Sequence, residues 1–183
     1  MKRKRNRGGV TAVLVAVAVL AMLAATAWLV LGMMKRHNTE RGLAYLERGD
    51  YTQAALCLEK AARYSLRPDA AVLFRLAEAR LRLGDPAKAK DSLEKVIAIE
   101  PRNAPARYEL GKIYIGEKNF GEAKTEITAL EEIGTEEARE YAAELKTSIQ
   151  TGAVRGFFDE LLKKIIPGGV PDALKNIVPG TEE

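Results

Sequence analysis

The sequence is poor in the side chains from which metal sites and disulfides are built. Its 183 residues include one cysteine, one histidine and one tryptophan. A structural zinc site needs about four Cys, His or carboxylate ligands close together, and a disulfide framework needs paired cysteines. His37 and Cys57 satisfy neither requirement within one chain. We also find no Gly-rich phosphate loop and no Ser/His pairing. We therefore expect no metal, no cofactor, no catalytic residues and no enzyme activity.

The formal net charge of +4 does not indicate a basic surface. Five of the basic residues lie among the first nine positions, which contain no acid, and the remainder carries 24 basic and 25 acidic residues. Sequence-independent binding of nucleic acid depends on a broad basic face. We therefore expect no nucleic-acid partner.

Residues 10–34 form an uncharged run of 25 residues. As a helix this run is about 37 Å long, which exceeds the hydrocarbon thickness of a bilayer. A cleavable signal peptide is the alternative, because basic residues precede the run and Ala25-Thr26-Ala27 resembles a cleavage site. Cleavage there would leave residues 28–34 as an apolar stub. We favour an uncleaved transmembrane helix with the lipid bilayer as its partner, and Trp28 suits an interfacial belt.

Basic flanks predict the orientation of this helix. Five basic residues precede it, whereas Lys35, Arg36 and Arg41 follow it. Short basic flanks tend to stay on the cytoplasmic side. The prediction is a single-pass protein of the cytoplasmic (inner) membrane, with its N-terminus in the cytoplasm and everything after residue 35 extracytoplasmic. The lone Cys57 is tolerable in either redox compartment.

Three later segments align at a period of 34 to 35 residues. In each segment a small residue precedes an alanine by twelve positions: Gly42 and Ala54, Ala77 and Ala89, Gly111 and Ala123. A turn sequence lies between the two small positions: Gly49-Asp50-Tyr51, Gly84-Asp85-Pro86, Lys118-Asn119-Phe120. This spacing predicts helical hairpins whose helices approach closely at the small residues, with turn residues that tolerate left-handed backbone or cap the second helix.

The pattern resembles the tetratricopeptide repeat (TPR) family over about 100 residues, as found in single-span membrane-anchored TPR proteins of the bacterial envelope type. The resemblance implies an all-α fold: an α-solenoid of three TPR helical hairpins plus a capping helix, preceded by one transmembrane helix. The expected segments are a basic cytoplasmic tail (1–9), the transmembrane helix (10–34), three repeats (35–134; about 35–68, 70–103 and 104–134), the capping helix (135–151), and an amphipathic C-terminal helix with a tail (152–183).

Departures from the family pattern carry their own expectations. Arg80 stands where the first and third repeats have the aromatic residues Tyr45 and Tyr114. Thr135 is suited to cap the helix that closes the solenoid. No helix breaker lies between Gly32 and Gly42, so the transmembrane helix should continue directly into the first repeat.

The resemblance assigns the inner groove to the first helix of each hairpin. The corresponding positions are Leu43, Leu46, Glu47, Phe74, Arg75, Glu78, Leu81, Arg82, Tyr108, Lys112 and Ile115. This largely apolar lining suits an amphipathic helix or an apolar extended peptide. The alternative is that several of these residues, especially Leu46, Leu81 and Ile115, only pack within the hairpins.

Chaperone-binding relatives hold a C-terminal carboxylate pair with Lys and Asn side chains. The matching positions here are Thr39, Leu43, Arg75, Pro105 and Glu109. Only Arg75 is cationic, so the sequence argues against recognition of a chaperone C-terminus.

The C-terminal segment has a second apolar face. Large apolar residues recur at helical spacing: Phe157, Phe158, Leu161, Leu162, Ile165 and Ile166. So short a helix is marginal alone in water. This amphipathic tail helix therefore docks on the protein's own groove or flank, on a partner or second copy, or at the membrane interface; the sequence leaves these three open.

We interpret the chain as a membrane-anchored TPR scaffold that binds a protein or peptide partner and assists translocation, folding or assembly of cell-envelope proteins. The alternative is a cytosol-facing receptor on an organelle membrane that reads targeting peptides. Residues 122–144 carry eight glutamates, whereas residues 60–112 are predominantly basic. Head-to-tail homo-oligomers through these regions are therefore a further interpretation, against the simpler one of solvated helix faces.

Overall fold

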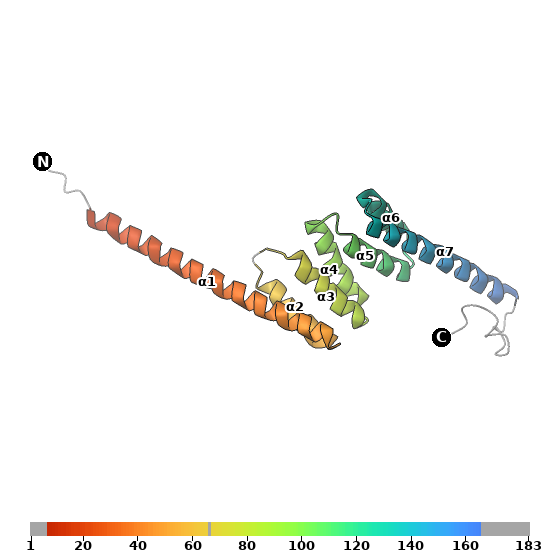
Figure 1. The fold of residues 1–183 in the computed structure, drawn as a ribbon, viewed down its shortest axis with the longest axis horizontal. Helices are drawn as coiled ribbons and strands as arrows, with labels where there is room; N and C mark the ends of the chain where they lie inside the picture. The colour runs from red at the N-terminus through yellow and green to blue at the C-terminus, as the bar shows by residue number, and fades with distance from the viewer. Residues whose placement is uncertain (1–6, 66, 166–183) are drawn as a thin grey trace. The chain divides into compact units, whose positions relative to one another are not determined.

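A computed structural model describes residues 7–65 and 67–165, and within them the chain forms seven α-helices and no strands (Figure 1). Side chains are described for residues 12–65 and 67–152. The chain divides into two compact units, Met1–Ile99 and Glu100–Glu183.

The first unit contains α1 (Arg7–Glu47), α2 (Tyr51–Arg63), α3 (Ala70–Arg82) and α4 (Pro86–Ile99). Helix α1 packs against α2, α3 packs against α4, and α2 also contacts α3. Leu58, Ala61, Val72 and Leu76 form the buried cluster between α2 and α3. The two predicted hairpins of this unit are therefore joined through a shared core.

The second unit contains α5 (Ala104–Gly116), α6 (Phe120–Ile133) and α7 (Glu136–Ile165). Helix α7 contacts both α5 and α6. Its buried residues Ala138, Ala142 and Leu145 join Leu130 of α6 in one core cluster. The Thr135 Oγ1 atom accepts a hydrogen bond from the Ala138 backbone N–H at 3.2 Å. The expected capping helix is thus present, and Thr135 caps its start.

The small residues that define the repeat are buried in both units. Ala54, Ala89 and Ala123 are each 0% exposed, and Ala77 is 1% exposed. A Cβ atom built on Gly42 would lie 2.7 Å from Cγ of Leu58 in α2. Real Cβ contacts are longer than this, so helix packing itself requires glycine at position 42.

Each hairpin turn contains a residue in the left-handed region. Gly49 has φ of 76°, Gly84 has φ of 73°, and Lys118 occupies the corresponding position with φ of 57°. Asp50 and Asn119 then accept backbone hydrogen bonds at the starts of α2 and α6. Left-handed geometry and an N-cap at these turns are confirmed, and Lys118 adopts that geometry despite its Cβ atom.

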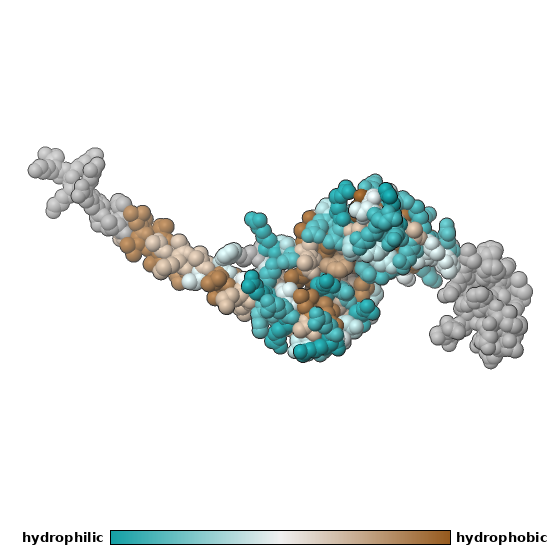
Figure 2. Space-filling model, in the orientation of Figure 1, coloured by the Kyte–Doolittle hydropathy of each residue, from teal (hydrophilic) through white to brown (hydrophobic). Residues whose placement is uncertain are grey.

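Helix α1 is continuous for 41 residues and joins the apolar run to the first hairpin. Figure 2 shows its apolar residues at the surface, in contrast to the largely hydrophilic face of the hairpins. Leu20 and Trp28 are 65% and 66% exposed. One segment, Ala12–Glu47, is long and apolar enough to cross a membrane, and none of the most apolar stretch of this segment is buried in the protein. Burial in the protein core therefore does not account for this apolar sequence, although a signal sequence would share the same properties.

The structure corrects the expected separation of the capping helix and the C-terminal helix. Helix α7 runs without interruption from Glu136 to Ile165, across Gly152. A glycine inside a helix costs about 1 kcal/mol, which does not by itself end a helix whose neighbours favour it. The side chains of Phe157, Phe158, Leu161, Leu162 and Ile165, and all of Ile166, lie outside the described residues. The three alternatives for this apolar face therefore stay predictions.

Candidate functional site

A groove lies between α1 and the start of α3 in the first unit. It encloses about 570 Å³. Its lining residues are Gly32, Lys35, Arg36, Thr39, Glu40, Leu43, Asp69, Ala71, Val72 and Arg75. We call this the α1–α3 groove. Two first helices of successive hairpins form its walls, as the repeat pattern predicts for a binding groove.

An ion pair joins the two walls of the α1–α3 groove. The Lys35 Nζ atom lies 2.6 Å from Oδ2 of Asp69, and both side chains are about one-third exposed. The other carboxylate oxygen of Asp69 accepts hydrogen bonds from the backbone N–H groups of Ala71 and Val72. The hydrogen bond from Lys35 holds the pKa of Asp69 below its ordinary value, and the backbone donors add to this effect against the opposing effect of burial. Asp69 thus caps the N-terminus of α3 and also links the two walls of the groove through its ion pair with Lys35.

The predicted residues Leu43 and Arg75 both line the α1–α3 groove. Arg75 donates to Glu78 at 2.9 Å, but both side chains are more than 40% exposed. An exposed pair three residues apart on a helix contributes little to stability and is readily exchanged. The Arg75 guanidinium can therefore turn to a ligand carboxylate at small cost, beside the apolar surface of Leu43 and Ala71.

Other predicted groove residues of the first unit lie outside this lining. Leu46 packs against the buried cluster between α2 and α3. Glu47 and Arg82 are exposed, whereas Phe74, Glu78 and Leu81 are half-buried.

In the second unit, Tyr108 of α5 stacks on Tyr141 of α7. Their ring centroids are 4.3 Å apart and their planes differ by 16°. Tyr108 Oη donates to Glu144 at 2.5 Å, and Lys112 Nζ lies 4.7 Å from the Tyr108 ring centroid. Burial and the neighbouring Glu144 carboxylate raise the pKa of Tyr108, so its hydroxyl stays protonated and acts as a donor. The capping helix thus contributes Tyr141 and Glu144 to the surface predicted from Tyr108 and Lys112.

Ile115, the remaining predicted residue of this unit, packs against the core cluster of α6 and α7. The same cluster is contacted by Tyr108 and Tyr141. Tyr108 therefore has both a packing face and a polar edge, whereas Ile115 agrees with the alternative of packing within the fold.

Two family models for the tetratricopeptide repeat match the sequence, one over residues 39–90 and the other over residues 80–149. Together with the paired helices, they identify the fold. The chain belongs to the tetratricopeptide repeat family. No curated protein sequence matches it.

Solved TPR domains share this fold at low sequence identity. The Sgt2 TPR domain from Aspergillus fumigatus is 19% identical with a TM-score of 0.55, covering 63% of this chain and 79% of that domain. The second TPR domain of human RPAP3, solved with an HSP70 peptide, is 20% identical with a TM-score of 0.55, covering 63% and 98%. The TPR2B domain of yeast Sti1, solved as a pHsp70 complex, is 17% identical with a TM-score of 0.52, covering 67% and 98%. At these identities the likeness shows the fold alone.

The positions of the TPR carboxylate clamp remain mostly uncharged here, but the α1–α3 groove contains further cations. Lys35 and Arg36 join Arg75 in its lining, with Glu40 and Asp69 as the acids. From the sequence, Lys35 and Arg36 are predicted only to flank the apolar run and not to line a groove. The signal was available, because Lys35, Thr39 and Leu43 follow one another at helical i, i+4 spacing and therefore share a face of α1.

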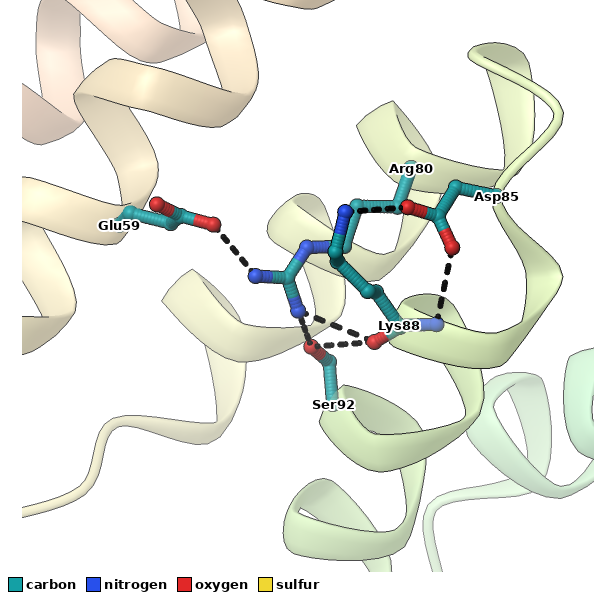
Figure 3. A network of polar contacts seen from close by, with 5 residues as sticks. All are labelled: Glu59, Arg80, Asp85, Lys88 and Ser92. Carbon is teal, nitrogen blue, oxygen red and sulfur yellow. Dashed lines mark hydrogen bonds and ion pairs between the residues drawn. The ribbon is translucent and has the colours of Figure 1, made fainter.

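Arg80, the departure from the aromatic TPR position, holds three helices together (Figure 3). Its guanidinium lies 2.5 Å from Glu59 of α2 and donates to Ser92 Oγ of α4 at 2.7 Å and to the Lys88 carbonyl at 3.0 Å. The Arg80 side chain is only 16% exposed. A planar guanidinium with several donors thus takes the interior place of an aromatic ring and replaces its packing with directed bonds.

Among the residues whose side chains are described, no group of three His, Cys, Asp or Glu could hold a metal ion. Cys57 of α2 is a buried free thiol, 6% exposed. It behaves as a small apolar core residue.

Proposed function

We propose that this TPR protein is anchored by α1 in a membrane and binds a peptide or helical segment of a protein partner through the first helices of its repeats. The α1–α3 groove carries the proposal, because it combines apolar surface at Leu43 and Ala71 with cationic and acidic side chains on its walls. Such a lining suits a short segment with apolar anchors and a few charges. The Tyr108–Tyr141 surface of the second unit is a further contact region of the same kind.

The exposed apolar part of α1 supports the anchor. A bilayer would cover residues that the described protein leaves exposed, including Leu20 and Trp28. The charge bias favours a cytoplasmic N-terminus and an extracytoplasmic TPR body, consistent with a scaffold that assists translocation, folding or assembly of envelope proteins. The alternative with a specific basis is a cytosol-facing receptor on an organelle membrane, since the same groove would read targeting peptides.

Site-specific photo-crosslinking in intact membranes tests the groove. A crosslinking amino acid replaces Thr39, which lines the α1–α3 groove, and in a second protein replaces Thr52, an exposed residue of α2. We expect a discrete adduct from position 39, reduced by Leu43→Asp and absent from position 52. Identical adducts from both positions, or adducts insensitive to Leu43→Asp, would reject the groove as the binding surface.

Cysteine labelling tests the anchor and its orientation. A Cys57→Ser background with a cysteine at exposed Ala87 reports the TPR body. Labelling by a membrane-impermeant reagent without permeabilising the cytoplasmic membrane is expected. Labelling only after permeabilisation would instead support the cytosol-facing receptor, and release of the protein on washing membranes at high pH would reject the anchor.

A further inference from the structure

A second cavity lies in the first unit, where α1 passes the loop between α2 and α3. It encloses about 780 Å³. From α1 it takes the apolar residues Trp28, Leu29, Leu31 and Met33, with Gly32 between them. We call this cavity the juxtamembrane pocket. It shares Gly32, Lys35 and Arg36 with the α1–α3 groove but extends toward the other side, to the end of α2.

The polar wall of the juxtamembrane pocket is cationic. Lys35, Arg36 and Arg67 line it, and no acidic residue does. Lys35 is already paired with Asp69. Arg36 and Arg67 are exposed, and neither forms an ion pair with a residue whose side chain is described. Two guanidinium groups therefore remain to meet an anion, and guanidinium suits phosphate in particular.

A buried polar atom adds an independent observation. Ser65 lines the juxtamembrane pocket, and its Oγ is buried without a hydrogen-bond partner among the described residues. Buried hydroxyl groups are normally satisfied, so this one points to a missing acceptor or donor.

Along α1, the apolar surface of the pocket comes first and its cationic surface follows, in the same order as the acyl chains and headgroups of a membrane. Trp28 and Lys35 are seven residues apart on one continuous helix, which is about 10 Å along its axis. The headgroup region on each side of a bilayer is about 5–7 Å deep, so this stretch of α1 is long enough to cross it. With α1 inserted, the apolar wall would face acyl chains while the arginines lie at the level of the phosphates.

We propose that the juxtamembrane pocket binds one anionic phospholipid, with its phosphate on Arg36 and Arg67 and the start of an acyl chain along Trp28 and Met33. The proposal rests on the membrane anchor of the proposed function. It commits to a lipid because a free anion would leave the apolar half of the pocket unfilled. It commits to an anionic lipid because the ammonium group of a zwitterionic headgroup would be repelled by the guanidinium groups of Arg36 and Arg67.

Trp28 is the only tryptophan of the chain and lies in the pocket, so its fluorescence reports the lipid beside it. The full-length protein is reconstituted in phosphatidylcholine vesicles with a small, fixed fraction of lipid brominated on the acyl chain. The brominated lipid is phosphatidylglycerol in one sample and phosphatidylcholine in the other. We expect stronger quenching by the anionic lipid than by phosphatidylcholine. Arg36→Gln and Arg67→Gln should each reduce this preference for the anionic lipid by about fivefold.

Arg48→Gln is the matched control, because it removes the same charge from an exposed residue outside the pocket. Equal quenching by the two lipids, or an equal loss of preference in Arg48→Gln, would overturn the pocket while leaving the anchor intact. Absence of quenching by either lipid would overturn both. Inorganic phosphate at matched ionic strength should not displace the brominated lipid, and displacement would show a free-anion site instead. Thermal unfolding of each variant, compared with the parent protein, verifies that replacing these exposed arginines leaves the fold intact.

Discussion

Gly111 of α5 faces Leu145 of α7 so closely that a Cβ atom at position 111 would lie 2.6 Å from Cδ1 of the leucine. Leu145 is 1% exposed and belongs to the core of the second unit. Gly111, the small residue of the third repeat, therefore allows the capping helix α7 to pack closely against α5. This explains why a glycine stands here although helix interiors disfavour it.

Gly111→Ala should destabilise the second unit by about 1–3 kcal/mol, because Leu145 has little room to move away. Chemical unfolding of the full chain in detergent micelles, followed by circular dichroism, measures the change. Gly116→Ala is the control in the same helix, since nothing lies within 4 Å of a Cβ there. It should be neutral or stabilising by up to about 1 kcal/mol. Similar losses for both variants would contradict the close contact.

Lys118→Gly should stabilise the protein by up to about 1 kcal/mol, because Lys118 is a non-glycine residue at positive φ. The reciprocal change, Gly84→Ala, should destabilise by about 1 kcal/mol through backbone strain alone, since no atom crowds that position. Melting temperatures of the two variants against the parent should therefore move in opposite directions. Shifts of the same sign would exclude left-handed geometry at one of these turns.

Arg80→Met should destabilise the first unit by about 1–3 kcal/mol, because Glu59 and Ser92 lose a charged partner in a half-buried site. Arg82→Met, an exposed change on the same helix, should be nearly neutral. A double-mutant cycle with Glu59→Gln measures the coupling between Arg80 and Glu59. A coupling energy near zero would show that the Arg80 side chain acts only by filling space.

Asp69 predicts an acid-sensitive contribution to stability. Its pKa is lowered in the folded protein, so the stabilisation is present above the unfolded pKa of about 4 and is lost as the pH falls through the folded value. Asp69→Asn should therefore lower the melting temperature at neutral pH and leave it unchanged in strong acid. Melting curves across this range check the sign, and a variant equally destabilised at every pH would contradict the ion pair with Lys35.

The fold was predictable because its signals are local and repeated. Gly42, Ala54 and Ala89 recur at fixed spacing. A Cβ atom at Gly42 would lie too close to Leu58, and both alanines are fully buried. The turn at Gly49 follows from backbone sterics alone. These features depend on few neighbours, so the sequence pattern is sufficient to predict them.

Contacts between distant charged residues were not predictable in this way. Arg107 of α5 and Glu126 of α6 form an ion pair at 2.8 Å with side chains only 15% and 10% exposed, yet either could have been a surface charge. Lys35 and Asp69 come within ion-pair distance only because their two hairpins pack together. Helix α7 continues past Gly152, where composition changes but the backbone does not break. Partner choice among charges depends on the assembled fold, which periodicity does not encode.

The unbroken α1 has a rotational consequence for an anchored protein. Each residue advances the helix by about 100°, so the azimuth of Thr39 and Leu43 is tied to that of Trp28 through the backbone itself. One residue inserted between these positions would turn the groove wall by that angle relative to the membrane-facing side, whereas seven inserted residues would nearly restore it. The number of residues between Trp28 and Thr39 thus sets the direction in which the groove faces, independently of any residue the partner touches.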